Sequence, residues 1–213
     1  MNVLVIKANN RPASQGISSR MFETFMNSIK EAEKLNVSVF DVFEEDMPYI
    51  GQDLFNAFDK LQSGEALTDF EQRLLSAKQK AKDALKQADV VVVAFPLWNL
   101  TIPAPLHTFI DYVTEAGFTF KYSSEGKLIP LMPEKKVILL NASGGVYSSP
   151  EMQPMEMAVN YMRNMFGGTF GMEIIDEVII EGHNANPDQS EQIINEGLHK
   201  VEEVAEKLIS QLD

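Results

Sequence analysis

The sequence predicts an α/β fold built on a doubly wound parallel sheet. Two observations support this prediction. The first is a series of short apolar runs rich in β-branched residues, of which VVVVAF (residues 90–95) is the most continuous. Strands of this kind are buried on both faces. The second is that helix-like segments separate the runs, and parallel strands joined through helices are the economical way to cover both faces.

Five runs are expected to form strands: VLVIKA (3–8), VSVFDVF (37–43), VVVVAF (90–95), KVILLNAS (136–143) and EIIDEVIIEG (173–182). The second run alternates apolar with small or polar residues, as a strand near a sheet edge does. Five strands fit the flavodoxin-like order 2-1-3-4-5 with helices on both faces, whereas a dinucleotide-binding Rossmann fold usually has a sixth strand. With no internal repeat and no long linker, a single domain over residues 1–213 is expected.

Amphipathic segments between the strands are expected to form helices. The first, SRMFETFMNSIKEA (residues 19–32), places four apolar side chains on one helical face: Phe22, Phe25, Met26 and Ile29. A less regular stretch follows over residues 44–66. Thr68 and Glu71 then form the pattern of a capping box, which predicts a helix that continues to about residue 88.

Three more helices are predicted in the second half of the chain. One begins at about Pro105, and one extends from about Pro154 to Phe166. The last follows the fifth strand, and its apolar residues recur at the spacing of one helical stripe: Ile194, Leu198, Val201, Ala205, Leu208 and Leu212. These helices complete the covering of both faces of the predicted sheet.

Composition excludes several kinds of chemistry. The sequence has no cysteine, so disulfides and thiolate chemistry are absent, and any redox chemistry must come from a cofactor. The histidines and carboxylates show no compact metal-ligand spacing, and we expect no metal. The formal charge of −13 disfavours nucleic acid and anionic membranes as partners, so an anionic cofactor requires a local binding device. With neither a targeting leader nor a membrane-spanning stretch, cytoplasmic residence is the expectation.

Ligands of an open parallel sheet bind beyond the carboxyl ends of the strands, where the strand order reverses. This rule selects the loops after the first, third and fourth strands. The first loop, NNRPASQGISSR (residues 9–20), leads into a helix whose free N–H groups and dipole favour a phosphate, with hydroxyl donors from Ser18 and Ser19. The alternative is that one of these serines merely caps the helix. The loop contains neither a dinucleotide-binding nor a triphosphate-binding glycine motif.

The second loop, FPLWNLTIP (residues 95–103), follows the valine run. Pro96 lacks a backbone donor and is expected to end the strand. Trp98 then offers an apolar plate and Asn99 an amide at the rim of the sheet. The alternative is that Trp98 is an ordinary core or interface aromatic.

The third loop, NASGGVYSS (residues 141–149), contains two consecutive glycines. Gly144 and Gly145 allow a planar ligand to approach main-chain N–H groups closely. The alternative is that the pair only forms a turn. Because all three loops converge on one edge of the sheet, a shared ligand site is expected there.

Together, KANN, SQGISSR, FPLWNLTIPAPLHTFID, GFTFKY and NASGGVY resemble the FMN-dependent NADH azoreductases, flavodoxin-like enzymes related to NAD(P)H:quinone reductases. The resemblance covers nearly the whole chain, including IEGHN after the fifth strand. It implies an FMN phosphate site formed by Asn9, Gly16, Ile17 and Ser18. It implies that the isoalloxazine ring is lined by Pro96, Leu97, Trp98 and Asn99, and its pyrimidine side by Asn141, Ser143, Gly144 and Gly145. The family more often has Ser-x-Ser where this chain has Gly-Ile-Ser, so one hydroxyl contact is lacking, and backbone N–H groups can supply the site instead.

The resemblance also implies the activity. An FMN-dependent NAD(P)H oxidoreductase of this family takes a hydride from NADH, with NADPH as an open alternative. It then reduces a quinone or an aromatic azo compound in the second step of a ping-pong cycle, and FMN rather than a catalytic side chain carries the hydride chemistry. Homodimers with flavin sites at the subunit interface are implied as well. The candidate substrate or interface residues are aromatic or methionine side chains: Phe118, Phe120, Tyr122, Tyr147, Met162, Met165 and Phe166.

Two other classes of function are open. A flavodoxin-like electron carrier would pass single electrons between proteins, and an acidic surface would suit a basic partner. A regulatory or scaffolding protein would keep the fold without binding flavin. Among the histidines, His107 and His199 are expected to pack or lie exposed on helices, whereas His183 follows the fifth strand at the same edge as the three loops.

Overall fold

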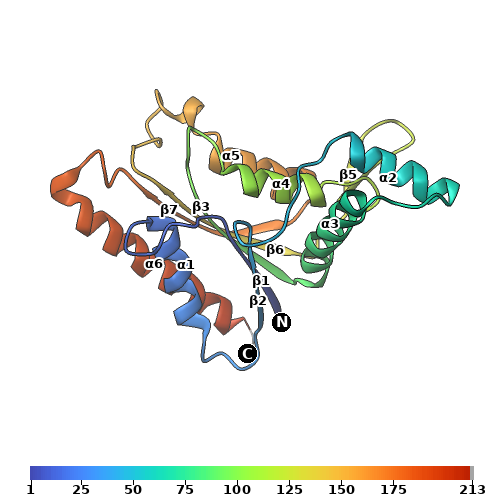
Figure 1. The fold of residues 1–213 in the computed structure, drawn as a ribbon. Coiled ribbons are helices and arrows are strands. Elements are labelled where there is room, and N and C mark those ends of the chain that lie inside the picture. Colours follow the sequence, from blue (N-terminus) through green and yellow to red (C-terminus); the bar gives the residue numbers. More distant parts are fainter. Residues whose placement is uncertain (212–213) are drawn as a thin grey trace.

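A parallel five-stranded sheet lies at the centre of the structure, a computed structural model that describes residues 1–211. Its strands are β1 (Asn2–Lys7), β2 (Asn36–Asp41), β3 (Val90–Pro96), β6 (Lys136–Ser143) and β7 (Glu173–Glu181). They follow the order β2-β1-β3-β6-β7 (Figure 1), which is the predicted order 2-1-3-4-5. The predicted edge position of the second strand and the flavodoxin-like arrangement are therefore confirmed.

Helices cover both faces of this sheet. One face carries α1 (Ile17–Ile29) and α6 (Ser190–Ser210), which pack against each other (Figure 1). The other face carries α3 (Asp69–Gln87), α4 (Ala104–Val113) and α5 (Ala158–Met162), and α2 (Gln52–Ser63) packs on α3. Within residues 1–211, none of the helices combines the length and the apolar character that crossing a membrane requires.

The continuous valine run of β3 follows from its central position. Side chains of a strand alternate between the two faces of a sheet. Val91 and Val93 therefore pack in the layer with α3 and α4, and Val90 and Val92 pack in the layer with α1 and α6. All four are fully buried. Because helices cover both faces, β3 has no position for a polar side chain and consists of an unbroken β-branched run.

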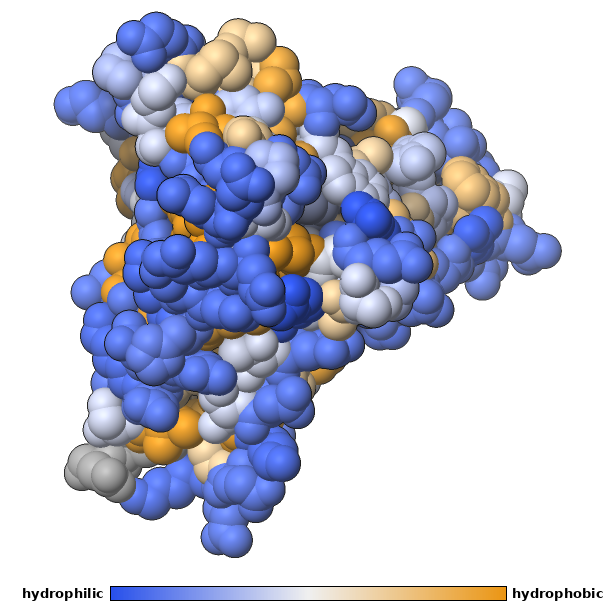
Figure 2. All heavy atoms as spheres, turned by 90° about the vertical axis from the view of Figure 1, so that its left-hand side faces the viewer, coloured by the Kyte–Doolittle hydropathy of each residue, from blue (hydrophilic) through white to orange (hydrophobic). Residues whose placement is uncertain are grey.

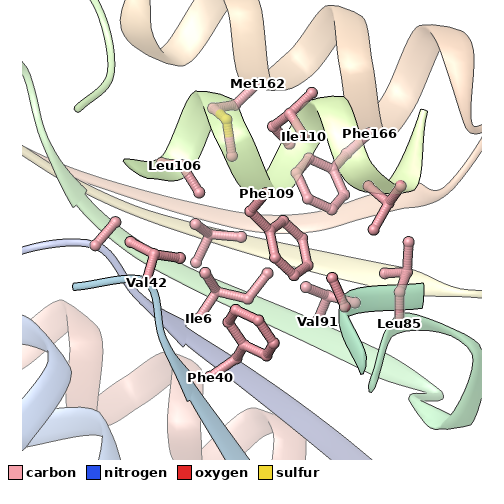
Figure 3. Packing of buried hydrophobic residues seen from close by; sticks show 14 of the residues in the cluster. Ile6, Phe40, Val42, Leu85, Val91, Leu106, Phe109, Ile110, Met162 and Phe166 are labelled. Atoms are coloured by element: carbon pink, nitrogen blue, oxygen red, sulfur yellow. The ribbon is translucent and has the colours of Figure 1, made fainter. Parts of the chain in front are cut away.

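The core on the α4 side contains several large aromatic side chains (Figure 3). Phe109 of α4 points toward the sheet and contacts Phe40 of β2, with ring centroids 5.0 Å apart. Phe166 packs in the same layer beside Ile110, and its ring centroid lies 5.5 Å from that of Phe170. Full burial of such a side chain contributes roughly 1.5–3 kcal/mol to stability. This layer therefore holds α4 firmly on the sheet.

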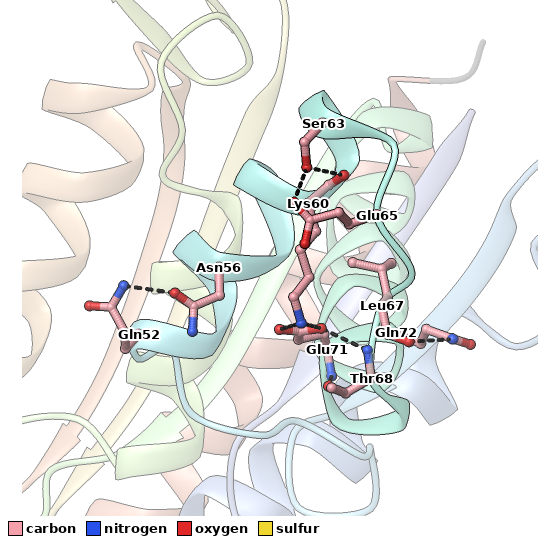
Figure 4. Close-up of polar contacts among 9 residues, drawn as sticks. All are labelled: Gln52, Asn56, Lys60, Ser63, Glu65, Leu67, Thr68, Glu71 and Gln72. Atoms are coloured by element: carbon pink, nitrogen blue, oxygen red, sulfur yellow. Dashed lines mark hydrogen bonds and ion pairs between the residues drawn. The ribbon is translucent and has the colours of Figure 1, made fainter.

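The helix α3 begins at the predicted capping box (Figure 4). The Thr68 hydroxyl accepts a hydrogen bond from the Glu71 N–H at 3.2 Å, and the Glu71 carboxylate accepts one from the Thr68 N–H at 2.7 Å. Lys60, near the end of α2, donates to both carboxylate oxygens of Glu71 at 2.7 and 2.8 Å. The same carboxylate therefore starts α3 and ties α2 to it.

The stretch over residues 44–66 is more regular than the sequence predicts, because it contains α2. This helix buries Leu54 and Ala57 on α3, whereas Phe55 and Phe58 lie exposed on its outer face. Its apolar residues recur at helical spacing, but the helix begins after Gly51 without a side-chain cap, so no start signal marks it in the sequence. The aromatic face of α2 is open to a partner or to solvent.

The helix expected from about Pro154 to Phe166 is wrong in both bounds. A 3-10 turn, η1 (Gln153–Met155), precedes α5, and a π-helical segment, η2 (Arg163–Thr169), follows it. Glu156 separates the turn from the helix. Its carboxylate accepts hydrogen bonds of 3.0, 2.7 and 3.0 Å from the backbone N–H groups of Ala158, Val159 and Asn160. A carboxylate at this position satisfies the free N–H groups of the first turn, so the helix begins there.

Two short elements were not predicted. An antiparallel hairpin of β4 (Phe120–Tyr122) and β5 (Leu128–Pro130) follows α4, and a 3-10 turn, η3 (Pro187–Gln189), precedes α6. The apolar stripe predicted for the last helix packs against the sheet through Ile194, Val201, Ala205 and Leu208. Leu212, the last residue of the predicted stripe, lies outside the described residues.

Candidate cofactor site

A cavity of about 420 Å³ opens at the carboxyl edge of the sheet, and we call it the rim cavity. All three predicted loops contribute to its wall. The predicted residues that line it are Asn9, Gly16, Ile17, Ser18, Pro96, Leu97, Trp98 and Gly144. The structure adds Arg11, Gln15, Ala142, His183, Asn184, Ser190 and Ile194. The expected convergence of the loops on one edge is therefore found in the folded chain.

Internal hydrogen bonds hold the first loop in one shape. Asn9 Nδ2 donates to Ser18 Oγ at 2.9 Å, and the Arg11 N–H donates to Asn9 Oδ1 at 3.0 Å. Ser19 Oγ donates to the Arg11 carbonyl at 2.7 Å. Glycine fits at position 16 because a Cβ on Gly16 would lie 3.1 Å from Asn9 Nδ2 and 3.2 Å from Arg11 Cβ. The loop is thus organised before any ligand binds.

Neither serine of this loop caps α1, so the capping alternative is wrong. No side chain accepts a hydrogen bond as the cap of α1. Ser18 instead accepts from Asn9, and Ser19 donates to the Arg11 carbonyl. The first-turn N–H groups, including that of Ile17, therefore have no partner within the helix. Because this helix start lines the rim cavity, an anion bound there gains hydrogen bonds and a favourable helix dipole.

The rim cavity also has the charge that an anion requires. The whole chain carries a formal charge of −13, yet none of the residues that line this cavity is Asp or Glu. Arg11 adds a guanidinium beside the start of α1. A helix start, hydroxyl and amide donors and one cationic side chain together form the local device that an acidic chain needs to bind a phosphate.

A tight turn presents Trp98 at the rim. Trp98 and Thr101 exchange backbone hydrogen bonds of 2.9 and 3.1 Å, which closes a turn through Asn99 and Leu100. Both central residues have positive φ, 50° for Asn99 and 72° for Leu100, as in a type I′ turn. This backbone costs about 1–2 kcal/mol for a residue such as leucine, and strain of this kind clusters at functional sites. The Trp98 ring lies 6.0 Å from that of Phe43, and Trp98 lines the cavity.

The end of β6 separates the rim cavity from a second cavity. Because strand side chains alternate, Ala142 and Gly144 line the rim cavity, whereas Asn141 and Ser143 line a cavity of about 280 Å³ on the α5 side. Asn141 is buried and donates from Nδ2 to the Phe95 carbonyl at 3.2 Å, which ties the ends of β3 and β6 together. The predicted ring-binding residues of this strand therefore lie on two sides of one wall.

The loop after β7 clamps the glycine loop after β6. The Gly182 N–H lies 3.2 Å from the Ser143 carbonyl and 3.0 Å from the Gly145 carbonyl. The Asn184 N–H donates to the Gly144 carbonyl at 3.1 Å. Glycine suits position 182 because its φ is 80°, a value that other residues adopt with strain. The position of the glycine loop is consequently set from the neighbouring strand.

His183 lies in this clamp and lines the rim cavity. Its Nδ1 is buried and has no hydrogen-bond partner among the described residues. Burial lowers the pKa of the imidazole, so the ring is neutral at pH 7. As expected from the sequence, His107 packs on a neighbour, with its ring centroid 5.0 Å from that of Tyr161, and His199 is exposed on α6.

Several predicted residues lie outside the rim cavity. Asn99 and Gly145 line neither cavity, and Tyr147 lines the second one. Phe166 is fully buried in the core and also lines neither cavity, so packing is its role in this structure. A ring enclosed in this way is closed to substrate within the single chain.

The aromatic residues of the GFTFKY segment lie far from the rim cavity in the same chain. Phe118 is partly buried, with Lys82 Nζ 4.8 Å from its ring centroid. Phe120 and Tyr122 belong to the hairpin, their rings are 5.5 Å apart, and Tyr122 is 63% exposed. Figure 1 places this hairpin, labelled β5, at the opposite end of the α4 layer from the loops at the carboxyl edge.

Exposed apolar side chains gather beside the second cavity. The residues concerned are Val146, Met152, Met155 and Ile179, each 39–43% exposed. Figure 2, which views the left-hand side of Figure 1, shows hydrophobic side chains near the top of a largely hydrophilic face. The second cavity therefore opens within a surface that favours an apolar ligand or a protein partner.

Known proteins share this chain's fold and much of its sequence. Residues 1–205 match a family model described as a flavodoxin-like fold. The FMN-dependent NADH:quinone oxidoreductase 3 of Bacillus thuringiensis subsp. konkukian is 47% identical over 206 residues, which cover 96% of this chain and 98% of that protein. The similarity therefore includes every loop of the rim cavity.

Solved structures extend the comparison. The azoreductase from Bacillus anthracis strain Sterne has a TM-score of 0.88 at 46% identity, with 97% of this chain and 99% of that chain covered. An FMN-dependent NADH-azoreductase from Bacillus anthracis strain Ames Ancestor, in complex with FMN, has a TM-score of 0.87 at 26% identity, with 98% and 99% covered. The chain therefore belongs to the flavodoxin-like family of FMN-dependent NADH:quinone oxidoreductases and azoreductases.

Proposed function

We propose that this chain is an FMN-dependent NADH:quinone oxidoreductase that also reduces aromatic azo compounds. The observation that carries the proposal is the rim cavity, which contains no carboxylate, begins at the uncapped start of α1 and continues past Trp98 and Gly144. The relatives support the cofactor and both acceptor classes, because their names specify FMN, NADH, quinone and azoreductase. NADPH stays open as an alternative electron donor.

At the α1 end of the cavity, the residues suit the FMN phosphate. The backbone N–H groups of Ile17 and Ser18 supply donors where a second serine is lacking, whereas the Gly16 N–H already donates to the Pro12 carbonyl at 2.9 Å. Ser18 Oγ already accepts from Asn9, so its own proton is available to a phosphate oxygen. Arg11 adds positive charge from the same loop. This end of the cavity thus binds and orients the cofactor.

At the other end of the cavity, two loops suit the flavin ring. The first contributes Pro96, Leu97 and Trp98 to the cavity lining, and the second contributes Gly144. Ring contacts for Asn99, Asn141, Ser143 and Gly145 are also proposed, although these four residues do not line the rim cavity. Main-chain N–H groups of the glycine loop would hold the pyrimidine side of a bound ring and stabilise negative charge there. When bound, FMN supplies the electron chemistry by accepting a hydride from NADH and passing the electrons to the acceptor in a second, ping-pong step. The protein binds and orients the cofactor and excludes water from the site. No side chain acts as a nucleophile.

We also propose a homodimer in which the hairpin of one chain covers the flavin site of the other. Phe120 and Tyr122 lie too far from the rim cavity of their own chain to serve it. Tyr122 is 63% exposed on the hairpin, and Phe55 is 57% exposed on α2, so the hairpin end has apolar surface for a partner. Tyr147 at the second cavity is then the substrate candidate supplied by the same chain as the flavin.

Two broader proposals accompany this function. Residues 1–213 form a single FMN-binding domain, supported by the one sheet on which both helical layers pack. We also propose that the protein resides in the cytoplasm, as the sequence leads us to expect.

The test begins with the visible spectrum of the purified protein after incubation with FMN and gel filtration. We expect a yellow protein, rapid two-electron bleaching on anaerobic mixing with NADH, and parallel double-reciprocal plots with a quinone. Bound flavin that NADH does not bleach indicates an electron carrier instead. A protein that retains no flavin and does not quench FMN fluorescence contradicts the proposal entirely.

A further inference from the structure

The buried Nδ1 of His183 requires an explanation. Within residues 1–211, which the structure describes, this nitrogen is buried and has no hydrogen-bond partner. An unpaired buried polar group destabilises a protein, and native structures pair nearly all such groups with protein, water or ligand. The missing partner is therefore a water molecule or a molecule that the chain binds.

The backbone holds His183 in place without help from its side chain. On one side, the Gly182 N–H is fixed against the carbonyls of Ser143 and Gly145, and on the other the Asn184 N–H donates to the Gly144 carbonyl. The imidazole is therefore positioned by the clamp between β6 and β7. The loop after β7 is therefore held by backbone hydrogen bonds, and the Nδ1 atom of His183 is not needed to hold it.

The surroundings of His183 point to an oxygen-rich ligand. The residue shares the rim cavity with Arg11 and Ser18, and no carboxylate lines this cavity that could pair with the ring. Burial lowers the pKa of His183, so the ring is neutral at pH 7. A neutral imidazole donates or accepts at Nδ1 according to its tautomer, so it can pair with a hydroxyl or with a phosphate oxygen.

We propose that His183 is a binding residue for the polar arm of FMN, in which a ribityl hydroxyl or a phosphate oxygen pairs with Nδ1. The inference rests on the proposed FMN cofactor. It assigns to the loop after β7 a direct contact with the ligand, in addition to its clamping of the glycine loop. The neutral ring suits this role because it adds a hydrogen bond without adding a charge to the cavity.

The experiment compares FMN binding to the apoprotein and to two variants, His183→Leu and His183→Gln, by quenching of flavin fluorescence. We expect the dissociation constant for FMN to rise about 3- to 10-fold, the loss of one neutral hydrogen bond. His199→Leu is the matched control, because that imidazole is exposed on α6 and lines neither cavity. Riboflavin distinguishes the two oxygen sources: an equal rise for riboflavin assigns the contact to the ribityl chain, and a rise for FMN alone assigns it to the phosphate.

Two further readouts separate binding from a structural role. In the apoprotein, His183→Leu removes an unpaired polar atom, so the melting temperature is expected to stay constant or rise while FMN affinity falls. In the native protein, FMN is expected to move the ¹⁵Nδ1 resonance of His183. Unchanged FMN affinity in both variants, or an unmoved Nδ1 resonance at saturating FMN, overturns the inference. Failure of the native protein to bind FMN would instead defeat the proposed function, so the two failures are distinguishable.

Discussion

The side chain of Asn184 fills the space in which a Cβ on Gly144 would lie. A Cβ built there overlaps the Asn184 amide nitrogen and lies 3.0 Å from its Cγ. Asn184 comes from the loop after β7 and Gly144 from the loop after β6, and their backbones are joined by the hydrogen bond from the Asn184 N–H to the Gly144 carbonyl. The two loops are thus packed to contact at the wall of the rim cavity, and a change on one must move the other.

The first prediction concerns Gly144→Ala. The added methyl group displaces Asn184 and disturbs the cavity wall, so we expect a loss of about 1–3 kcal/mol in stability and weaker FMN binding. The double variant Gly144→Ala/Asn184→Ala removes the obstructing amide and is expected to recover most of the loss. Thermal melts and FMN titrations of all four proteins form a double-mutant cycle.

Gly168→Ala is the control for this cycle, because a Cβ on Gly168 meets no atom within 4 Å. Its melting temperature and FMN affinity should match those of the native protein. Strict additivity of the Gly144 and Asn184 changes would show that the two residues do not obstruct each other.

The second prediction concerns the phosphate end of the rim cavity. Arg11 is exposed, so its contribution to an anion is partly screened by water. Arg11→Gln is expected to weaken FMN binding by about 0.5–1.5 kcal/mol and to reduce its dependence on salt. Riboflavin, which lacks the phosphate, should bind both proteins equally well. Arg20→Gln is the control, since Arg20 lines neither cavity, and an equal effect of both variants would contradict a local role for Arg11.

The third prediction concerns the strained turn after β3. Leu100 has a φ of 72°, which glycine adopts freely and a β-branched residue strongly resists. We expect Leu100→Gly to change stability by less than about 1 kcal/mol and Leu100→Val to lower it by about 1–2 kcal/mol. Leu131→Val, at a leucine without positive φ, is the control for the change in side-chain shape. Equal melting temperatures for the Leu100 variants would show that the turn carries no backbone strain.

Local patterns in the sequence were sufficient to predict the sheet. The β3 run is unbroken because helices cover both faces of that strand, and the β2 run alternates because that strand lies at an edge. Strand order and the loops at the carboxyl edge then follow from general rules of parallel sheets. For this reason Ser18, Trp98 and Gly144 could be expected at one site, and all three line the rim cavity.

The remaining wall of the site depends on tertiary contacts that no local pattern reports. Asn184 and Ser190 line the cavity because α6 packs beside α1. In the sequence, only the EGHN segment after the fifth strand indicated that this loop lies at the same edge. The helix α2 was not predicted because it begins after Gly51 without a side-chain cap, so no start signal marks it in the sequence. Glu156 separates the 3-10 turn η1 from α5 within the single helix that was predicted, because its carboxylate accepts hydrogen bonds from three backbone N–H groups at the start of α5.

The fourth prediction concerns the carboxylate that joins α2 to α3. Hydrogen bonds from Lys60 and from the Thr68 N–H hold the pKa of Glu71 below its usual value of 4.5. A carboxyl group with a lowered pKa stabilises the fold above its unfolded pKa, and this stabilisation is lost as the pH falls through the folded pKa. Glu71→Gln should therefore melt at a lower temperature than the native protein at pH 7, and the difference should shrink below about pH 4.5.

Two further variants calibrate this measurement. Thr68→Ala removes the other half of the capping box and is expected to cost about 1 kcal/mol at pH 7. Glu65→Gln changes a nearby exposed carboxylate that accepts a hydrogen bond from the Ser63 hydroxyl (Figure 4), and the melting temperature of this variant should not change measurably. If the difference in melting temperature between Glu71→Gln and the native protein stayed constant down to pH 3, the ion pair of Lys60 with the ionised Glu71 carboxylate would not contribute to stability.

The last prediction tests whether the hairpin of one chain covers the flavin site of its partner chain. One chain carries Phe120→Ala and Tyr122→Ala in the hairpin and keeps its rim cavity. The other keeps its hairpin and carries Gly144→Ala and Arg11→Gln in the rim cavity. If the hairpin serves the partner's flavin, the mixed dimer contains one site with a native cavity and a native hairpin, so it should recover about half of the quinone reductase activity per dimer.

If the hairpin served its own chain, both sites of the mixed dimer would be defective, and its activity would equal the mean of the two mutant homodimers. Separation of the mixed dimer by two different affinity tags makes the two outcomes distinguishable, because only the first arrangement rebuilds a complete site from two damaged chains.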